Sequence, residues 1–119
     1  ITAQTGIKSL DVTIDCDNLD ARKLGTMGIP ARFDLCNIEG FEDTNGTMHP
    51  AEDVREAISA LGFPIEDAVK DKPSIRLKID KMFTRLLTGF PGNNNFILTV
   101  TENNGLSTTK TLKYYVPAN

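Results

Sequence analysis

Residues 95–116 constrain the fold of this chain most, because they predict two long strands joined by a tight turn. In the first strand, apolar residues alternate with polar or β-branched ones, and the inward set is Phe96, Leu98 and Val100. A period of two is typical of a strand that is buried on one face. Residues 103–105 (Asn-Asn-Gly) interrupt the pattern, and residues 106–116 resume it with Thr and Tyr. A terminal hairpin of this length predicts a β-sandwich.

The register of this hairpin follows from the position of its loop. A two-residue loop, Asn104 with Gly105, would place the apolar residues of the two strands on opposite faces. A three-residue loop, residues 103–105, places both apolar sets on one face and pairs Phe96 with Leu112. It also puts Gly105 at the left-handed position that such a loop requires. The sequence therefore favours the three-residue loop.

Lys110 is the one residue that departs from this pattern. In the favoured register it lies opposite Leu98, on the face that is expected to be buried. Two interpretations remain open: the side chain snorkels at a sheet edge, or it lies beside a second bulge.

The rest of the chain predicts shorter elements. Alternating apolar residues indicate three more strands, at residues 7–15, 31–37 and 74–80. Three short helices are expected: one capped by Asp17 or Asn18, one that Pro50 opens at its first position, and one capped by Asp80. Residues 39–49 are polar and read as a surface loop, and so does the Asn run 93–95.

These elements predict an antiparallel β-sandwich with short helical crossovers. Strands and helices do not alternate with the regularity of a parallel sheet. The chain of 119 residues is long enough for one core, so residues 1–119 are expected to form a single domain. It begins at Ile1 without a signal-like segment, which favours a fragment or mature form of a longer chain.

Charge and hydropathy argue against two classes of partner. The net charge is −3, and no cluster of Lys and Arg is longer than a pair. Nucleic acids and anionic membranes require a positive surface, so neither is expected as a partner. No apolar run approaches the roughly 20 residues of a transmembrane helix.

Cys16 and Cys36 allow two interpretations. A disulfide between them would close a loop of about 20 residues and contribute roughly 3 kcal/mol. Strand parity argues against it, because Cys16 continues an inward series whereas Cys36 lies on the face opposite Phe33 and Leu35. Two unpaired, small hydrophobic residues are therefore favoured.

The hairpin resembles the last two strands of bacterial immunoglobulin-like domains of the PKD and related types. Residues 95–105 and the Thr-rich residues 108–111 carry this resemblance, with Gly92 as the upstream glycine and Phe96 as the aromatic residue. More broadly, the chain is similar to immunoglobulin-like domains of surface lipoproteins from gut Bacteroidetes. There, a strand such as residues 10–15 leads into a helix, and a Phe-Asp-Leu strand follows, as in residues 33–35 here.

This resemblance implies an immunoglobulin-like fold and an extracytoplasmic module, at the outer-membrane surface or in the periplasm. It implies that the partners are other domains of the same chain, and a polysaccharide or surface protein as a further possibility. It brings no catalytic residues with it.

Asp15, Asp17 and Asp20 form the densest acidic cluster and are the candidate calcium ligands. Calcium prefers several such oxygens on a compact loop, but the spacing here fails the EF-hand pattern. A helix cap followed by an acidic first turn explains the same residues, so no cofactor is expected.

Tyr115, Phe90 and Phe41 are the candidate ligand-binding residues. Sugar-binding sandwiches stack sugar rings on exposed aromatic side chains, chiefly Trp and Tyr, and this chain has no Trp. The alternatives are cross-strand packing for Tyr115 and a lid over the core for Phe90.

Catalysis is not expected. The single histidine, His49, precedes Pro50 and reads as a residue at a helix start, and no nucleophile elbow surrounds any serine. The leading hypothesis is therefore a non-catalytic extracellular spacer or interaction module. A glycan-binding module is the alternative, and a small hydrolase is the second alternative.

Overall fold

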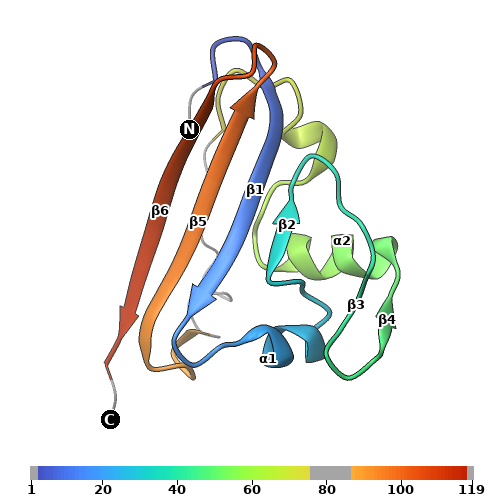
Figure 1. The fold of residues 1–119 in the computed structure, drawn as a ribbon, viewed down its shortest axis with the longest axis vertical. Coiled ribbons are helices and arrows are strands. Elements are labelled where there is room, and N and C mark those ends of the chain that lie inside the picture. The colour runs from blue at the N-terminus through green and yellow to red at the C-terminus, as the bar shows by residue number, and fades with distance from the viewer. Residues whose placement is uncertain (1–2, 76–86, 118–119) are drawn as a thin grey trace.

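A computed structural model describes residues 3–75 and 87–117 of the chain. It is mostly β, and all strand pairs in it are antiparallel. The main sheet has four strands in the order β2-β1-β5-β6 (Figure 1): β2 is Arg32–Asp34, β1 is Ile7–Cys16, β5 is Gly92–Glu102 and β6 is Ser107–Val116. The predicted β-rich, antiparallel class is confirmed.

The two central strands, β1 and β5, form the body of the sheet. Leu10 lies opposite Val100, Val12 opposite Leu98 and Ile14 opposite Phe96, and all these side chains are buried. The residues between them in sequence point to the other face, which is rich in Thr and only partly covered. Alternation in the sequence thus becomes one buried and one polar face of the sheet.

The terminal hairpin has the predicted register. Phe96 pairs with Leu112. The Glu102 amide donates to the Leu106 carbonyl at 2.8 Å, and Gly105 has a φ of +90°. Lys110 lies opposite Leu98 without a register shift, and it is exposed because β6 is the edge strand of the described sheet. The interpretation of Lys110 as an edge lysine is therefore confirmed, and the second bulge is wrong.

A layer of helices and loops covers the buried face of the sheet. It contains α1 (Ala21–Thr26), α2 (Ala51–Ala60), the 3-10 helix η1 (Glu66–Ala68), and a small hairpin of β3 (Phe41–Glu42) and β4 (Met48–His49). Val54 and Ile58 of α2 are fully buried in the core that this layer shares with the sheet. Within the described residues the second layer is thus mainly helical, and the immunoglobulin-like sandwich remains a prediction.

Several predicted boundaries are wrong. The cap of α1 is Asp20, whose carboxylate accepts the Lys23 amide at 2.9 Å. Asp17 instead accepts the Asn93 amide at 2.8 Å, tying the end of β1 to the start of β5. Pro50 is the N-cap of α2 and not its first helical residue.

Two predicted loops contain strands. Residues 39–49 hold the β3–β4 hairpin, and the Asn run 93–95 belongs to β5 because it pairs with β1 on one side and β6 on the other. Within this run, Asn94 is fully buried, and its amide donates to the Phe90 carbonyl at 3.2 Å. Tertiary pairing here overrides a low strand propensity.

The second predicted strand is shorter than expected. β2 ends at Asp34, where the carboxylate accepts the Cys36 amide at 2.9 Å and turns the chain. Most of the predicted strand 74–80 and the helix that Asp80 was expected to cap lie outside the described residues.

Cys16 and Cys36 are free thiols. Cys36 follows Leu35, whose amide donates to the Leu10 carbonyl, and Cys16 lies six residues further along β1. Six strand residues span roughly 20 Å, far beyond the reach of a disulfide. The unpaired interpretation agrees with the structure.

Candidate functional site

An open pocket of about 380 Å³ lies beside β2, on the polar face of the sheet. Its lining combines carboxylates, one guanidinium, one carboxamide and two phenylalanines, of which Phe33 is buried in the core; the residues are Asp11, Pro30, Arg32, Phe33, Asp34, Asn37, Glu39, Gly40 and Phe41. With three carboxylates and one guanidinium, the pocket is negatively charged.

The carboxylates meet because β1 and β2 pair in one particular register. Asp11 and Asp34 lie directly opposite each other, an arrangement that destabilises a sheet unless it is compensated. The Asp34 carboxylate accepts the amides of Leu10 at 3.0 Å and Cys36 at 2.9 Å, which holds its orientation. Arg32 lies two residues from Asp34 and so projects from the same face of β2.

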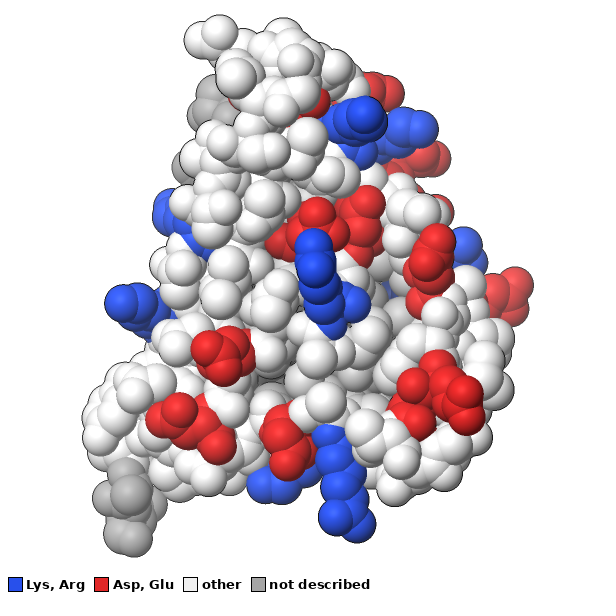
Figure 2. Space-filling view, viewed as in Figure 1, with Lys and Arg blue, Asp and Glu red and all other residues white. Residues whose placement is uncertain are grey.

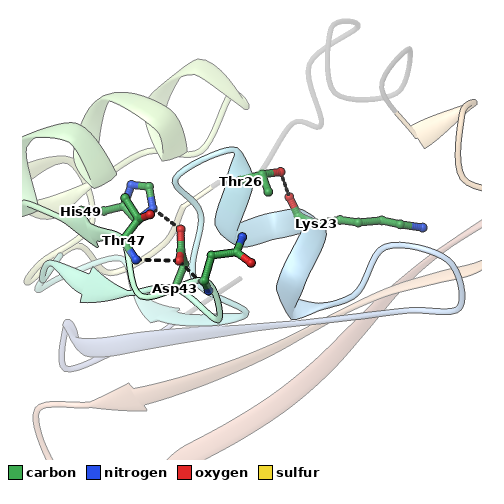
Figure 3. A network of polar contacts seen from close by, with 6 residues as sticks. Lys23, Thr26, Asp43, Thr47 and His49 are labelled. Atoms are coloured by element: carbon green, nitrogen blue, oxygen red, sulfur yellow. Dashed lines mark hydrogen bonds and ion pairs between the residues drawn. The ribbon is translucent and has the colours of Figure 1, made fainter.

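Phe41 forms the wall of the pocket on the side of the β3–β4 hairpin. Its ring stacks on the His49 ring, with centroids 4.9 Å apart and an interplanar angle of 19°. The His49 Nε2 atom lies 2.8 Å from Asp43 Oδ2 (Figure 3). Asp43 Oδ1 also accepts the amides of Asn45 at 2.8 Å and Thr47 at 3.0 Å. This wall is therefore held by a hydrogen-bonded turn.

The Asp43–His49 pair is well packed. The side chain of Asp43 is 4% exposed and that of His49 is 17% exposed. The hydrogen bond from His49, with those from the turn amides, holds the pKa of Asp43 below its usual value. A methyl group added at Gly25 would come within 2.7 Å of the Asp43 Cβ atom, so only glycine lets α1 approach this closely. Asp43 thus packs closely against Gly25 of α1, and Figure 3 shows its hydrogen bonds with His49 and Thr47 within the hairpin.

A catalytic role for His49 gains no support from this packing. A nucleophile would have to lie at the second ring nitrogen, Nδ1, because Nε2 faces Asp43. A methyl group at Gly28 would lie 3.6 Å from Nδ1 and 4.0 Å from Ala57 Cβ, so this side of the ring faces backbone and an alanine.

The three candidate aromatic residues do not come together. Tyr115 is 66% exposed and lies opposite Asn93 on the polar face of β6. Phe90 packs partly against the core, and the Lys23 ammonium lies 5.7 Å from its ring centroid. Phe41 lies beyond β2, at the other edge of the sheet from Tyr115.

The candidate calcium ligands serve other purposes. Asp20 caps α1 and Asp17 binds the start of β5, whereas Asp15 lies opposite Asn95 within the sheet. Among residues 3–75 and 87–117, no three His, Cys, Asp or Glu side chains are grouped closely enough to hold a metal ion.

The sequence interpretation missed the Asp11–Asp34 pair and the partner of His49. Strand parity alone places Asp11 on the polar face, but its pairing with Asp34 requires the register of β1 with β2. The only signal for Asp43 was its place at the start of the polar turn 43–46, six residues before His49.

On the face displayed in Figure 2, acidic and basic side chains are interspersed and do not gather into one basic patch. None of the helices in the described ranges has the length and apolar character needed to cross a membrane. Comparison with protein-family models, curated proteins and solved structures finds no match for this chain.

Proposed function

We propose that this chain is a non-catalytic spacer and interaction module of a bacterial surface or periplasmic protein. The observation that carries the proposal is the separation between the segment that leads into β1 and the end of β6. Thr5 donates its amide to the Glu102 carboxylate at 3.2 Å and accepts the Asn103 side-chain amide at 2.9 Å, so the chain enters beside the β5–β6 turn. It leaves after Val116, which pairs with Gly92 at the far end of the hairpin.

The entry and exit points are therefore separated by the length of β6. Ten strand residues span about 33 Å, and the longest dimension of the molecule is 44 Å. Figure 1 shows β6 running along this long axis. A module with this geometry holds its neighbours apart, which is what a spacer must do.

The polar face of the sheet supplies the solvent-exposed surface that a spacer needs. Its hydroxyl groups bond across the strands, with Thr99 and Thr109 oxygens 3.3 Å apart and Thr101 and Ser107 oxygens 3.2 Å apart. Such cross-strand pairs stabilise a sheet without apolar exposure. The immunoglobulin-like type and the surface or periplasmic location rest on the hairpin resemblance and belong to the same proposal.

The distance between the two ends tests the spacer role. With labels at Gln4→Cys and Pro117→Cys, in a chain with Cys16→Ala and Cys36→Ala, we expect one narrow distance distribution centred at about 33 Å. A matched pair at Gln4→Cys and Asn104→Cys, both near the turn, should give a short distance. A broad distribution for the first pair, with a narrow one for the second, would contradict the spacer.

A glycan-binding module is the second candidate, and the pocket beside β2 favours it. Planar polar side chains beside one aromatic ring are the groups that hydrogen-bond and stack on a sugar. Within the pocket, Phe41 supplies the ring, and Asp11, Arg32 and Glu39 supply polar groups. Tyr115 and Phe90 are not part of this site.

Binding to a panel of plant, host and microbial polysaccharides, with calcium and with chelator, tests this candidate. If the pocket binds glycan, Phe41→Ala should weaken binding by about tenfold or more, whereas Tyr115→Ala should leave it unchanged. Glu39→Gln is the second pocket variant and should also weaken binding. Because Glu39 is exposed, this substitution should leave the fold intact, so a loss of binding could not be attributed to unfolding. Loss of binding in Tyr115→Ala alone, or no binding across the panel, would remove the pocket as a glycan site.

A further inference from the structure

The outer edge of β6 is long, and no strand among residues 3–75 and 87–117 pairs with it. β6 is the terminal strand of the described sheet, and its ten residues, Ser107–Val116, contain no proline. In Figure 1 no described element lies beyond it. Edge strands present a row of N–H and C=O groups that can pair with another chain, and proteins usually shorten or cover them. β6 is neither short nor covered by a described element.

The hydrogen-bond pattern identifies which backbone groups face outward. The Glu102 amide bonds to the Leu106 carbonyl at 2.8 Å, and the Asn103 amide bonds to Gly6 on the β1 side at 3.0 Å. Because bonded and non-bonded pairs alternate in an antiparallel ladder, the even-numbered residues of β6 bond to β5. The N–H and C=O groups of Thr109, Thr111 and Lys113 therefore point away from the sheet.

The side chains along this edge are basic and exposed. Ser107 to Thr111 are exposed on both faces of the strand. Lys110 projects from the core-facing side and Lys113 from the polar side, and β6 has no acidic residue although the chain has a net charge of −3. The edge is thus locally positive on a molecule that is acidic overall.

Pairing with a second copy of this chain is disfavoured. In a continuous sheet with twofold symmetry, residues of the same face lie opposite each other. Consider pairings in which the twofold axis passes at residue 110, 111, 112 or 113. In each of them, Lys110 or Lys113 of one copy lies directly or diagonally opposite the same lysine of the other copy, roughly 5–8 Å away. Inward-pointing lysine on an edge strand is a known protection against self-association.

We propose that the outer edge of β6 accepts an extended, acidic segment of a partner protein as a fifth strand of the sheet. Thr109, Thr111 and Lys113 supply the backbone hydrogen bonds, and Lys110 and Lys113 select for acidic residues opposite them. This inference names the partner class for the interaction role proposed above.

Two synthetic peptides test the inference on the intact 119-residue chain. Each peptide has about eight residues, alternating Thr and Val, and its termini are blocked. Two of these residues, three positions apart, are replaced by Glu in one peptide and by Lys in the other. We expect the Glu peptide to bind at least about tenfold more tightly at low salt, and this preference to shrink as salt rises. In NMR titrations, the amides of Thr109, Thr111 and Lys113 should gain protection from exchange.

Thr111→Pro and Thr111→Val form the matched pair of variants. Proline removes one outward N–H that β5 does not use, a change that edge strands tolerate, whereas valine keeps it. Binding should fall by about tenfold or more in Thr111→Pro and persist in Thr111→Val. Should Thr111→Pro fail to fold, Lys110→Glu with Lys113→Glu answers the question, because it should reverse the preference toward the Lys peptide.

Three results would overturn the inference: no binding of either peptide, equal binding of both, or undiminished binding in a folded Thr111→Pro. These outcomes are separate from a failure of the spacer. If the distance distribution between residues 4 and 117 is narrow but neither peptide binds, only the proposed edge site is rejected. If that distribution is broad, the spacer role is rejected whether or not a peptide binds.

Discussion

Asp43 shows at the scale of one residue how a single carboxylate holds a polar turn together. Its carboxylate accepts two turn amides through Oδ1 and contacts His49 through Oδ2. The ring of His49 in turn supports Phe41, the wall of the pocket. The His49 ring and the two turn amides satisfy this carboxylate, whose side chain is only 4% exposed.

Acid should therefore weaken the fold through Asp43. Its pKa is lower in the folded state than in the unfolded chain, because His49 and the turn amides bind the charged form. The resulting stabilisation is fully present above the unfolded value, about 4, and is lost as the pH falls through the folded-state pKa. We expect the free energy of unfolding, measured in urea, to decline over this range in the natural chain.

Asp43→Asn should show a weaker decline over the same range, because it has no carboxylate to protonate at this position. Asp67→Asn, at an exposed position of η1, is the matched control for the loss of one charge. Equal pH dependence in the two variants would show that Asp43 is not the group responsible.

At the scale of elements, the β5–β6 hairpin is the part most completely encoded by local sequence. Its alternation, loop length and glycine position agree with one another, and the structure has the predicted pairs. β2 and the Asn run behave differently, because their state depends on strands that are distant in sequence. A three-residue strand such as Arg32–Asp34 has too few residues to establish a period.

Gly105 allows a direct test of the hairpin loop. Its φ is +90°, and a methyl group placed there would meet nothing within 4 Å, so only backbone strain opposes a substitution. We expect Gly105→Ala to lower the free energy of unfolding by about 1 kcal/mol. Gly105→Asn should cost less, because asparagine visits positive φ more readily. Equal losses in both variants would mean that the cost does not come from this backbone conformation.

At the scale of the whole molecule, the sheet order separates features that are close in sequence or similar in chemistry. Phe41 and Tyr115 lie near opposite edges of the sheet. Cys16 is at the end of β1, whereas Cys36 follows Leu35, which bonds to Leu10 nearer the start of that strand. Burial raises the pKa of Cys16 and of Cys36 to about 11, which keeps both thiols protonated near neutral pH. Both cysteines are partly buried and pack against the core.

The same sheet order sets the geometry on which the spacer proposal depends. β6 leads away from the turn beside which the chain enters, so the two ends are separated by a full strand length. The pocket beside β2 and the open edge of β6 lie at opposite edges of the sheet. A ligand in the pocket and a strand on β6 could therefore be bound at the same time.

Of the candidate site, the sequence identified Phe41 but not the Asp11–Asp34 pair, and for Lys110 it left an edge position and a second bulge open. Local sequence patterns set the hairpin register and the buried face of each long strand, and composition sets the overall negative charge. Tertiary pairing places β1 between β2 and β5, sets Asp11 opposite Asp34 and brings Asp17 to the start of β5. The reason is physical, because neighbouring residues set backbone conformation, whereas pairing between distant segments depends on which faces can be buried together.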